Sequence, residues 1–140
     1  MKLFNTLTLF SLLLSIGCSK TTDNSLPNVY VSYRDALSSP KLNKLSSAGN
    51  AVLIDGYGIA GLLLYKRVTD GVIVAYDRCS TVNPDKRCAV TIDNNNVTVT
   101  DPCSQAKFNL EDGQPSKAPA TLGLKRYSVY TTQFEIVVSN

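Results

Sequence analysis

The sequence predicts an all-β domain, a compact sandwich or barrel-like structure of short strands. Runs rich in Val, Ile, Leu and Tyr recur along the chain, as in Val72–Tyr76 and Val97–Val99. Residues that favour turns separate these runs roughly every 8–12 residues, a spacing typical of sandwiches and barrels. No stretch carries a long helical period, so helices should contribute little to the fold.

Two pairs of apolar runs predict β-hairpins. Ile59–Val68 and Val72–Tyr76 are separated by a short turn that ends in Asp-Gly, a strong hairpin signal. Val90–Ile92 and Val97–Val99 flank Asp93–Asn96, whose residue types tolerate tight turns. Each pair should therefore form two antiparallel strands.

Further strands are expected along the rest of the chain. Val29–Tyr33, Ala51–Ile54 and Phe108–Leu110 are short runs of strand-forming residues, and Tyr127–Val138 reads as two strands with a turn near its middle. The remaining candidate is Tyr33–Leu45, which has some helical character. It contains Pro40, so we expect at most one short helical turn there.

The N-terminus has the pattern of a bacterial lipoprotein signal. Lys2 precedes a mostly apolar run, Leu3–Ile16, that is too short for a membrane-spanning helix of about 20 residues. The run ends in Leu14–Cys18 (LSIGC), which matches a lipobox, so Cys18 is the predicted lipidation site. A polar tether is expected over 18–27 and one domain over 28–140, held at the bacterial cell envelope by the N-terminal lipid.

Composition narrows the classes of function. Removing residues 1–17 leaves 123 residues, enough for one domain, with a formal charge of +2. The chain has no histidine, which excludes Ser-His-Asp and Cys-His catalysis and histidine-bound metals. It has no basic run with interleaved aromatic residues, so no nucleic-acid partner is expected. We therefore predict that the protein has a non-enzymatic role.

Three cysteines remain besides Cys18. Cys79, Cys88 and Cys103 are an odd number, so at most one internal disulfide can form in an export compartment. There is no C-x-x-C motif that would indicate thiol redox chemistry.

Two segments resemble the cluster-binding loops of Rieske proteins. Ala75–Thr81 (AYDRCST) is similar to the first loop, A-[FY]-D-x-x-C-x-H, and Asp101–Leu110 (DPCSQAKFNL) to the second, C-P-C-H-G-x-x-F-D-L. Looser matches follow in the family's order at Asp112-Gly113, Lys117–Ala120, Leu122, Leu124, Tyr127 and Val129. The resemblance covers about residues 28–138 and is nearest to lipoproteins of the Bacteroidetes type. It implies a Rieske-like (ISP domain) β-sandwich with a three-stranded core and a cluster-binding-type subdomain inserted at about 77–108.

The four ligand positions of that family are mostly substituted here. A Rieske [2Fe–2S] centre is held by two cysteines and two histidines. The resemblance places Cys79 and Thr81 at the ligand positions of the first loop, and Asp101 and Ser104 at those of the second. We therefore expect no cofactor and no metal.

The resemblance also places Cys103 where relatives have a disulfide cysteine that clamps the two loops together. Its partner is either Cys79 or Cys88, and we favour Cys79, which would leave Cys88 as a buried thiol.

These observations predict a lipid-anchored, extracytoplasmic Rieske-fold protein that has lost its cluster. It would act as a structural or binding module for an unknown protein partner. The alternative is a membrane-tethered electron-transfer protein whose [2Fe–2S] cluster has non-standard ligands. Iron content and visible absorption distinguish the two.

Overall fold

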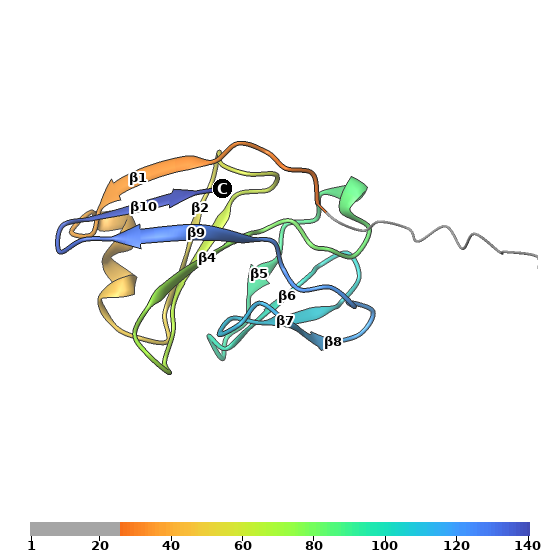
Figure 1. The fold of residues 1–140 in the computed structure, drawn as a ribbon. Coiled ribbons are helices and arrows are strands. Elements are labelled where there is room, and N and C mark those ends of the chain that lie inside the picture. The colour runs from red at the N-terminus through yellow and green to blue at the C-terminus, as the bar shows by residue number, and fades with distance from the viewer. Residues whose placement is uncertain (1–25) are drawn as a thin grey trace, which may run out of the picture.

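The computed structural model describes residues 26–140 of the chain. These residues fold into ten strands that are arranged in two antiparallel sheets (Figure 1). Residues 1–25, which include Cys18 and the predicted signal peptide, lie outside the described residues. The larger sheet has the spatial order β1 (Ser32–Ala36), β10 (Glu135–Ser139), β9 (Arg126–Thr131), β4 (Ile73–Asp77), β3 (Leu62–Lys66) and β2 (Ala51–Ile54). The smaller sheet has the order β5 (Thr91–Ile92), β6 (Thr98–Thr100), β7 (Lys107–Asn109) and β8 (Pro115–Lys117).

The predicted hairpins are confirmed. β3 pairs with β4, with Leu64 opposite Ala75, and the turn between these strands includes Asp70-Gly71. β5 pairs with β6, and β9 pairs with β10, each in antiparallel register. The expected all-β class is therefore confirmed.

β3 lies between two hydrophobic cores because alternate residues of a strand face opposite sides of the sheet. Leu62 and Leu64 belong to a first core, which draws residues from all six strands of the larger sheet. Leu63 and Tyr65 belong to a second core, formed with side chains of the smaller sheet. All four side chains are at most 1% exposed. The larger sheet thus curls around one core and rests its outer face on the smaller sheet.

The inserted subdomain is larger than the sequence predicted, and so is the core sheet. The smaller sheet and its loops occupy the chain between Asp77 and Arg126, whereas the sequence predicted an insertion over 77–108. The predicted C-terminal end of the insertion was wrong because β8 pairs with β7 but contains no apolar run that would reveal a strand. The expected three-stranded core was also wrong, since β1, β10 and β9 continue the sheet beyond β4.

Two short 3-10 helices connect strands in the described part of the chain. The first, η1 (Pro40–Ser46), is longer than the single turn that was expected. Pro40 begins this helix, a position where the missing N–H group costs nothing. The second, η2 (Pro84–Lys86), lies between β4 and β5. No helix within residues 26–140 has the length and apolar character needed to cross a membrane.

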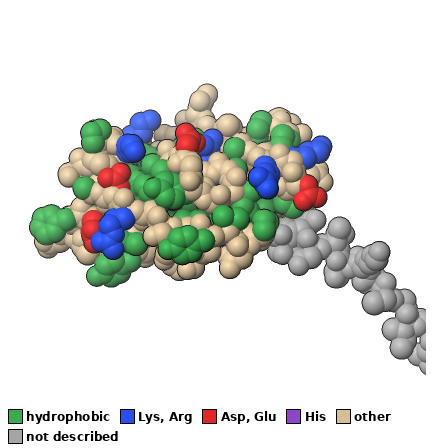
Figure 2. All heavy atoms as spheres, turned by 90° about the horizontal axis from the view of Figure 1, so that it is seen from above, with side chains coloured by type: hydrophobic (Ala, Val, Ile, Leu, Met, Phe, Trp, Pro, Cys, Tyr) green, Lys and Arg blue, Asp and Glu red, His purple; other side chains and the backbone are tan. Residues whose placement is uncertain are grey.

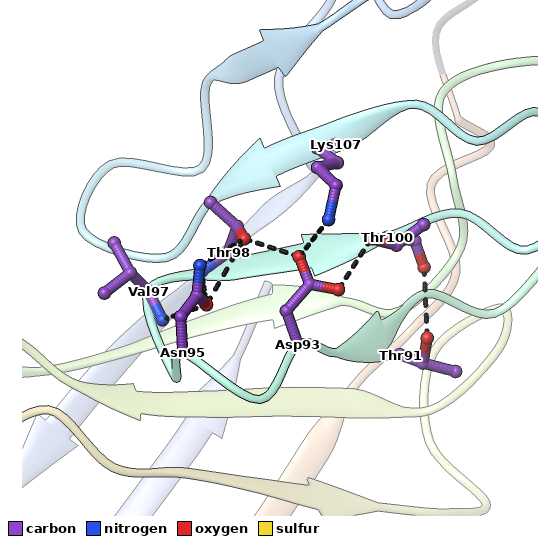
Figure 3. A network of polar contacts seen from close by, with 7 residues as sticks. All are labelled: Thr91, Asp93, Asn95, Val97, Thr98, Thr100 and Lys107. Atoms are coloured by element: carbon purple, nitrogen blue, oxygen red, sulfur yellow. Dashed lines mark hydrogen bonds and ion pairs between the residues drawn. The ribbon is translucent and has the colours of Figure 1, made fainter.

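A carboxylate network holds the β5–β6 turn to β7 (Figure 3). Asp93 accepts hydrogen bonds from the hydroxyls of Thr98 and Thr100 and from Nζ of Lys107, at 2.5–2.6 Å. Burial raises the pKa of Asp93, but the bonds from Lys107 and the two threonines hold it below its usual value. This network explains why Asp begins the turn. We assign it a structural role.

Candidate functional site

The first loop of the candidate site starts from a buried carboxylate at the end of β4. Asp77 is fully buried and accepts hydrogen bonds from the backbone N–H groups of Ile59 (2.7 Å), Ala60 (3.2 Å) and Cys79 (2.7 Å). The hydroxyl of Tyr127 on β9 donates a fourth bond of 2.7 Å. Burial, together with this bond to Asp77, raises the pKa of Tyr127 above its usual value. These four bonds fix the base of the loop against two other segments of the chain.

The second loop is a tight turn between β6 and β7. The backbone N–H of Gln105 donates to the carbonyl of Asp101, and the N–H of Asp101 donates to the carbonyl of Ala106, both at 2.8 Å. The Asp101 side chain, fully buried, accepts bonds from the N–H of Cys103 (2.8 Å) and the hydroxyl of Ser104 (2.6 Å). The turn is therefore organised around the carboxylate that replaces a ligand cysteine of the Rieske pattern.

The pKa of the Asp101 carboxyl lies below its usual value. Burial raises this pKa, but nearby hydrogen-bond donors, the Ser104 hydroxyl first, outweigh the effect of burial. The surroundings of Asp101 thus favour its charged form.

The two ligand positions of the first loop, Cys79 and Thr81, both contact backbone carbonyls. The Thr81 hydroxyl donates a 2.7 Å bond to the carbonyl of Leu122, and Thr81 is 7% exposed. Cys79 is fully buried, with its Sγ 3.6 Å from the carbonyl of Ser80 and 3.8 Å from that of Pro84. Burial, with a smaller contribution from the charge of Asp77, raises the pKa of Cys79 to about 11. Cys79 is therefore a protonated thiol at neutral pH.

The disulfide joins Cys88 to Cys103, with a Cα–Cα distance of 6.2 Å. The prediction that Cys103 takes part in a bridge is confirmed, but the favoured partner, Cys79, was wrong, and Cys88 is not a free thiol. Cys79 pairs with Ala89 in a β-bridge, and its side chain is buried. Cys88, the residue before Ala89, is the one whose sulfur reaches Cys103 in the second loop. The clamp therefore links the segment after η2 to the β6–β7 turn.

Among the described residues, one group of metal-ligating side chains converges. The donor atoms of Cys88, Asp101 and Cys103 all lie within 4.8 Å of one another, and Cys79 does not belong to this group. Cys79 and Asp101, which stand at two of the four Rieske ligand positions, thus do not belong to one donor group.

These residues do not fit a Rieske [2Fe–2S] cluster. Such a cluster needs two thiolates on one iron and two imidazoles on the other. The chain offers one protonated thiol at Cys79, two hydroxyls at Thr81 and Ser104, and a carboxylate at Asp101 that already accepts several hydrogen bonds. We derive no chemistry through a cluster here.

A pocket of about 430 Å³ lies beside Thr81, which the sequence did not indicate. Its other lining residues are Leu26, Gln114, Leu122, Gly123, Leu124 and Lys125. The Lys125 ammonium donates to the carbonyl of Pro27 and the side chain of Asn28, so the first described residues pass close to the pocket. Because the lining comes from three segments far apart in the chain, no local pattern could have revealed it.

Comparison with known proteins identifies the fold. No protein-family model matches the chain, and no curated protein matches its sequence. Among solved structures, it is similar to the plasma membrane Rieske protein PetC3 of the cyanobacterium Synechocystis PCC 6803, with 22% identity and a TM-score of 0.56 over 79% of this chain and 98% of that one. The ferredoxin of carbazole 1,9a-dioxygenase from Nocardioides aromaticivorans IC177 matches at 17% identity and a TM-score of 0.45, over 66% of this chain and 86% of that one. The likeness to PetC3 shows that the described part of the chain has a Rieske-like β-fold.

Proposed function

We propose that this protein is a lipid-anchored, extracytoplasmic Rieske-fold protein that has lost its iron–sulfur cluster and acts as a non-enzymatic structural or binding module. One observation carries the proposal. Asp101 and Ser104, the two residues at the ligand positions of the second loop, bond to each other at 2.6 Å. In this proposal the two positions, bonded to each other, have a structural role in the turn.

The electrostatics of the site support the same conclusion. Asp101 and Ser104 place a carboxylate and a hydroxyl where a Rieske centre has a thiolate and an imidazole. An iron bound at Cys79 would first have to remove a proton from a thiol whose pKa is about 11. Both features oppose assembly of a [2Fe–2S] cluster at these positions, which is why the electron-carrier alternative is less favoured.

The pocket beside Thr81 is the best candidate for the binding role. The first loop contributes Thr81 to its lining, and Leu122 and Leu124 give it apolar walls. Gln114 and Lys125 supply polar groups at the same pocket, the mixture that small-ligand and anchor-residue sites use. Figure 2 shows charged side chains of both signs scattered over the face in view, which gives no support for a nucleic-acid partner on that face.

The test of cluster loss is an iron and acid-labile sulfide assay on the full chain, expressed in cells with iron–sulfur assembly available. We expect no stoichiometric iron or sulfide and no visible absorption, and we expect Cys79→Ser to leave this result unchanged. A Rieske protein with intact ligands, prepared in parallel, shows that the cells load clusters. About two irons and two sulfides per chain, lost in Cys79→Ser, would establish the electron carrier instead.

A further inference from the structure

We propose that Cys88, Cys103 and Asp101 form a binding site for a thiophilic divalent cation, of which Zn²⁺ is the type, when the Cys88–Cys103 disulfide is reduced. This inference goes beyond the proposed function, because the site is mononuclear, needs no sulfide and lies apart from Cys79. It starts from the convergence of the three donor atoms within 4.8 Å of one another.

The spacing suits one metal ion. Zinc binds thiolate sulfur at about 2.3 Å and carboxylate oxygen at about 2.1 Å, so two donors on a tetrahedral zinc lie about 3.5 Å apart. The two sulfur atoms are bonded to each other in the oxidised protein and separate on reduction, and a carboxylate oxygen of Asp101 lies within 4.8 Å of both. Small side-chain rotations then reach the spacing that one zinc ion needs. Three protein donors leave a fourth position for water, the arrangement of an open zinc site.

The backbone holds these donors in place before any metal binds. Asp101 and Cys103 belong to one tight turn, in which the N–H of Cys103 bonds to the Asp101 carboxylate at 2.8 Å. Cys88 is fixed from the other side, because its carbonyl accepts a 2.8 Å bond from the N–H of Ser80. Neither loop has to reorganise for the donors to meet.

The Asp101 carboxylate keeps capacity for a metal. It accepts one bond on Oδ1 from the N–H of Cys103 and one on Oδ2 from the hydroxyl of Ser104. A carboxylate has about four acceptor positions, so these bonds leave room for a cation. Such bonds are also what orients a ligand carboxylate in metal sites, so Ser104 would serve as a positioning residue.

An external dithiol reduces the Cys88–Cys103 disulfide and so frees the two sulfur ligands. The dithiol transfers two electrons and two protons to the Cys88–Cys103 bond and becomes a disulfide itself. The two protein thiols then each release a proton to solvent as they bind the cation. Cys103 is exposed, whereas Cys88 and Asp101 are buried, so reductant and metal reach the site from the side of the second loop.

The donor set determines the kind of cation. Two thiolates and one carboxylate favour Zn²⁺ or Cd²⁺ over Mg²⁺ and Ca²⁺, which prefer oxygen ligands. The bound cation would link the segment that holds Cys88 to the turn that holds Cys103, as the disulfide does in the oxidised protein. Disulfide and metal are therefore alternative cross-links of the same two loops.

The test uses the full chain in detergent, oxidised or reduced with a phosphine that is then removed. Co²⁺ serves as the spectroscopic probe, because thiolate-to-cobalt charge transfer absorbs in the near ultraviolet. We expect one Co²⁺ per chain in the reduced protein and none in the oxidised protein, with displacement by Zn²⁺. At about 100 times its dissociation constant, Zn²⁺ should raise the Tm of the reduced protein by about 5 °C or more and leave the oxidised protein unchanged.

Two variants assign the ligands. Asp101→Asn should weaken Co²⁺ binding at least about tenfold in the reduced protein, whereas Asp85→Asn, at an exposed carboxylate near Cys88 but outside the donor group, should not. Cys103→Ser, which cannot form the disulfide, should lose the charge-transfer band. Equal binding by oxidised and reduced protein, an unchanged affinity in Asp101→Asn, or no binding to the reduced protein would overturn the proposal. Each result is independent of the iron and sulfide assay, so the two proposals fail separately.

Discussion

The hydroxyl of Ser104 lies 2.6 Å from the carboxylate of Asp101, so two positions that hold cluster ligands in the Rieske pattern are hydrogen-bonded to each other. Asp101 is fully buried, and this bond is one of those that hold its pKa below the usual value. A carboxyl whose pKa is lower in the folded than in the unfolded protein stabilises the fold above the unfolded value of about 3.9. That stabilisation is lost as the pH falls through the folded pKa.

Ser104→Ala should therefore lower the free energy of unfolding by about 1 kcal/mol at pH 7, and the difference from the parent protein should shrink between pH 5 and pH 2. Urea titrations at several pH values measure both quantities. Ser116→Ala, at an exposed position on β8, is the control and should change neither. A difference that stays constant down to pH 2 would show that Ser104 does not act through the charge of Asp101.

The Cys88–Cys103 bridge should stabilise the domain by about 3 kcal/mol, the value for a loop of about 15 residues. Reduction should lower the urea midpoint of the parent protein by a corresponding amount. Cys103→Ser should unfold at the midpoint of the reduced parent and should not respond to reductant. Peptide mapping of non-reduced protein would contradict the assignment if it found Cys79 joined to Cys103.

Tyr127→Phe removes one of four hydrogen bonds to the buried Asp77 carboxylate. We expect a loss of about 1–3 kcal/mol in the free energy of unfolding, because the donor cannot be replaced by water at a buried site. Tyr130→Phe changes the same chemical group three residues along β9, at a side chain that is 66% exposed, and should cost less than about 0.5 kcal/mol. Equal effects in the two variants would rule out a special role for the Asp77 bond.

Cys79 should be inert to alkylation in the folded protein. With a pKa of about 11, it is almost entirely protonated at pH 8, and its side chain is buried. We expect iodoacetamide to modify it at least about 100 times more slowly than an exposed thiol, with the rate rising as the pH rises toward the pKa. Mass spectrometry of native and urea-unfolded protein measures the ratio. Rapid labelling of the native protein at pH 8 would mean that the thiol is accessible.

Cys18→Ala should abolish membrane association if Cys18 carries the predicted lipid. The unlipidated full chain should leave the detergent phase in a partition experiment, whereas Cys79→Ala should remain in it. Cys18 precedes the described residues, so this prediction rests on the lipobox pattern alone. Retention of Cys18→Ala on membranes after a carbonate wash would remove support for lipid anchoring.

The sequence by itself determined the class of the fold and the order of most strands. The pairs β3–β4, β5–β6 and β9–β10 are local hairpins, so the signals that define them, two apolar runs and a turn, stand next to each other in the chain. Strands without such a neighbour were harder to predict. β8 is short, polar and held by its pairing with β7, and η1 begins at the proline that was expected to interrupt a helix.

Only the tertiary structure decided how the two loops meet. The sequence could assign Cys79, Thr81, Asp101 and Ser104 to ligand positions, but not that Asp101 and Ser104 bond to each other. It narrowed the partner of Cys103 to two cysteines, and the structure selected Cys88 because Cys79 is enclosed in the core. The pocket beside Thr81 likewise gathers residues from three segments. Such contacts depend on which side chains the packed sheets turn inward, and periodicity along one strand does not determine that.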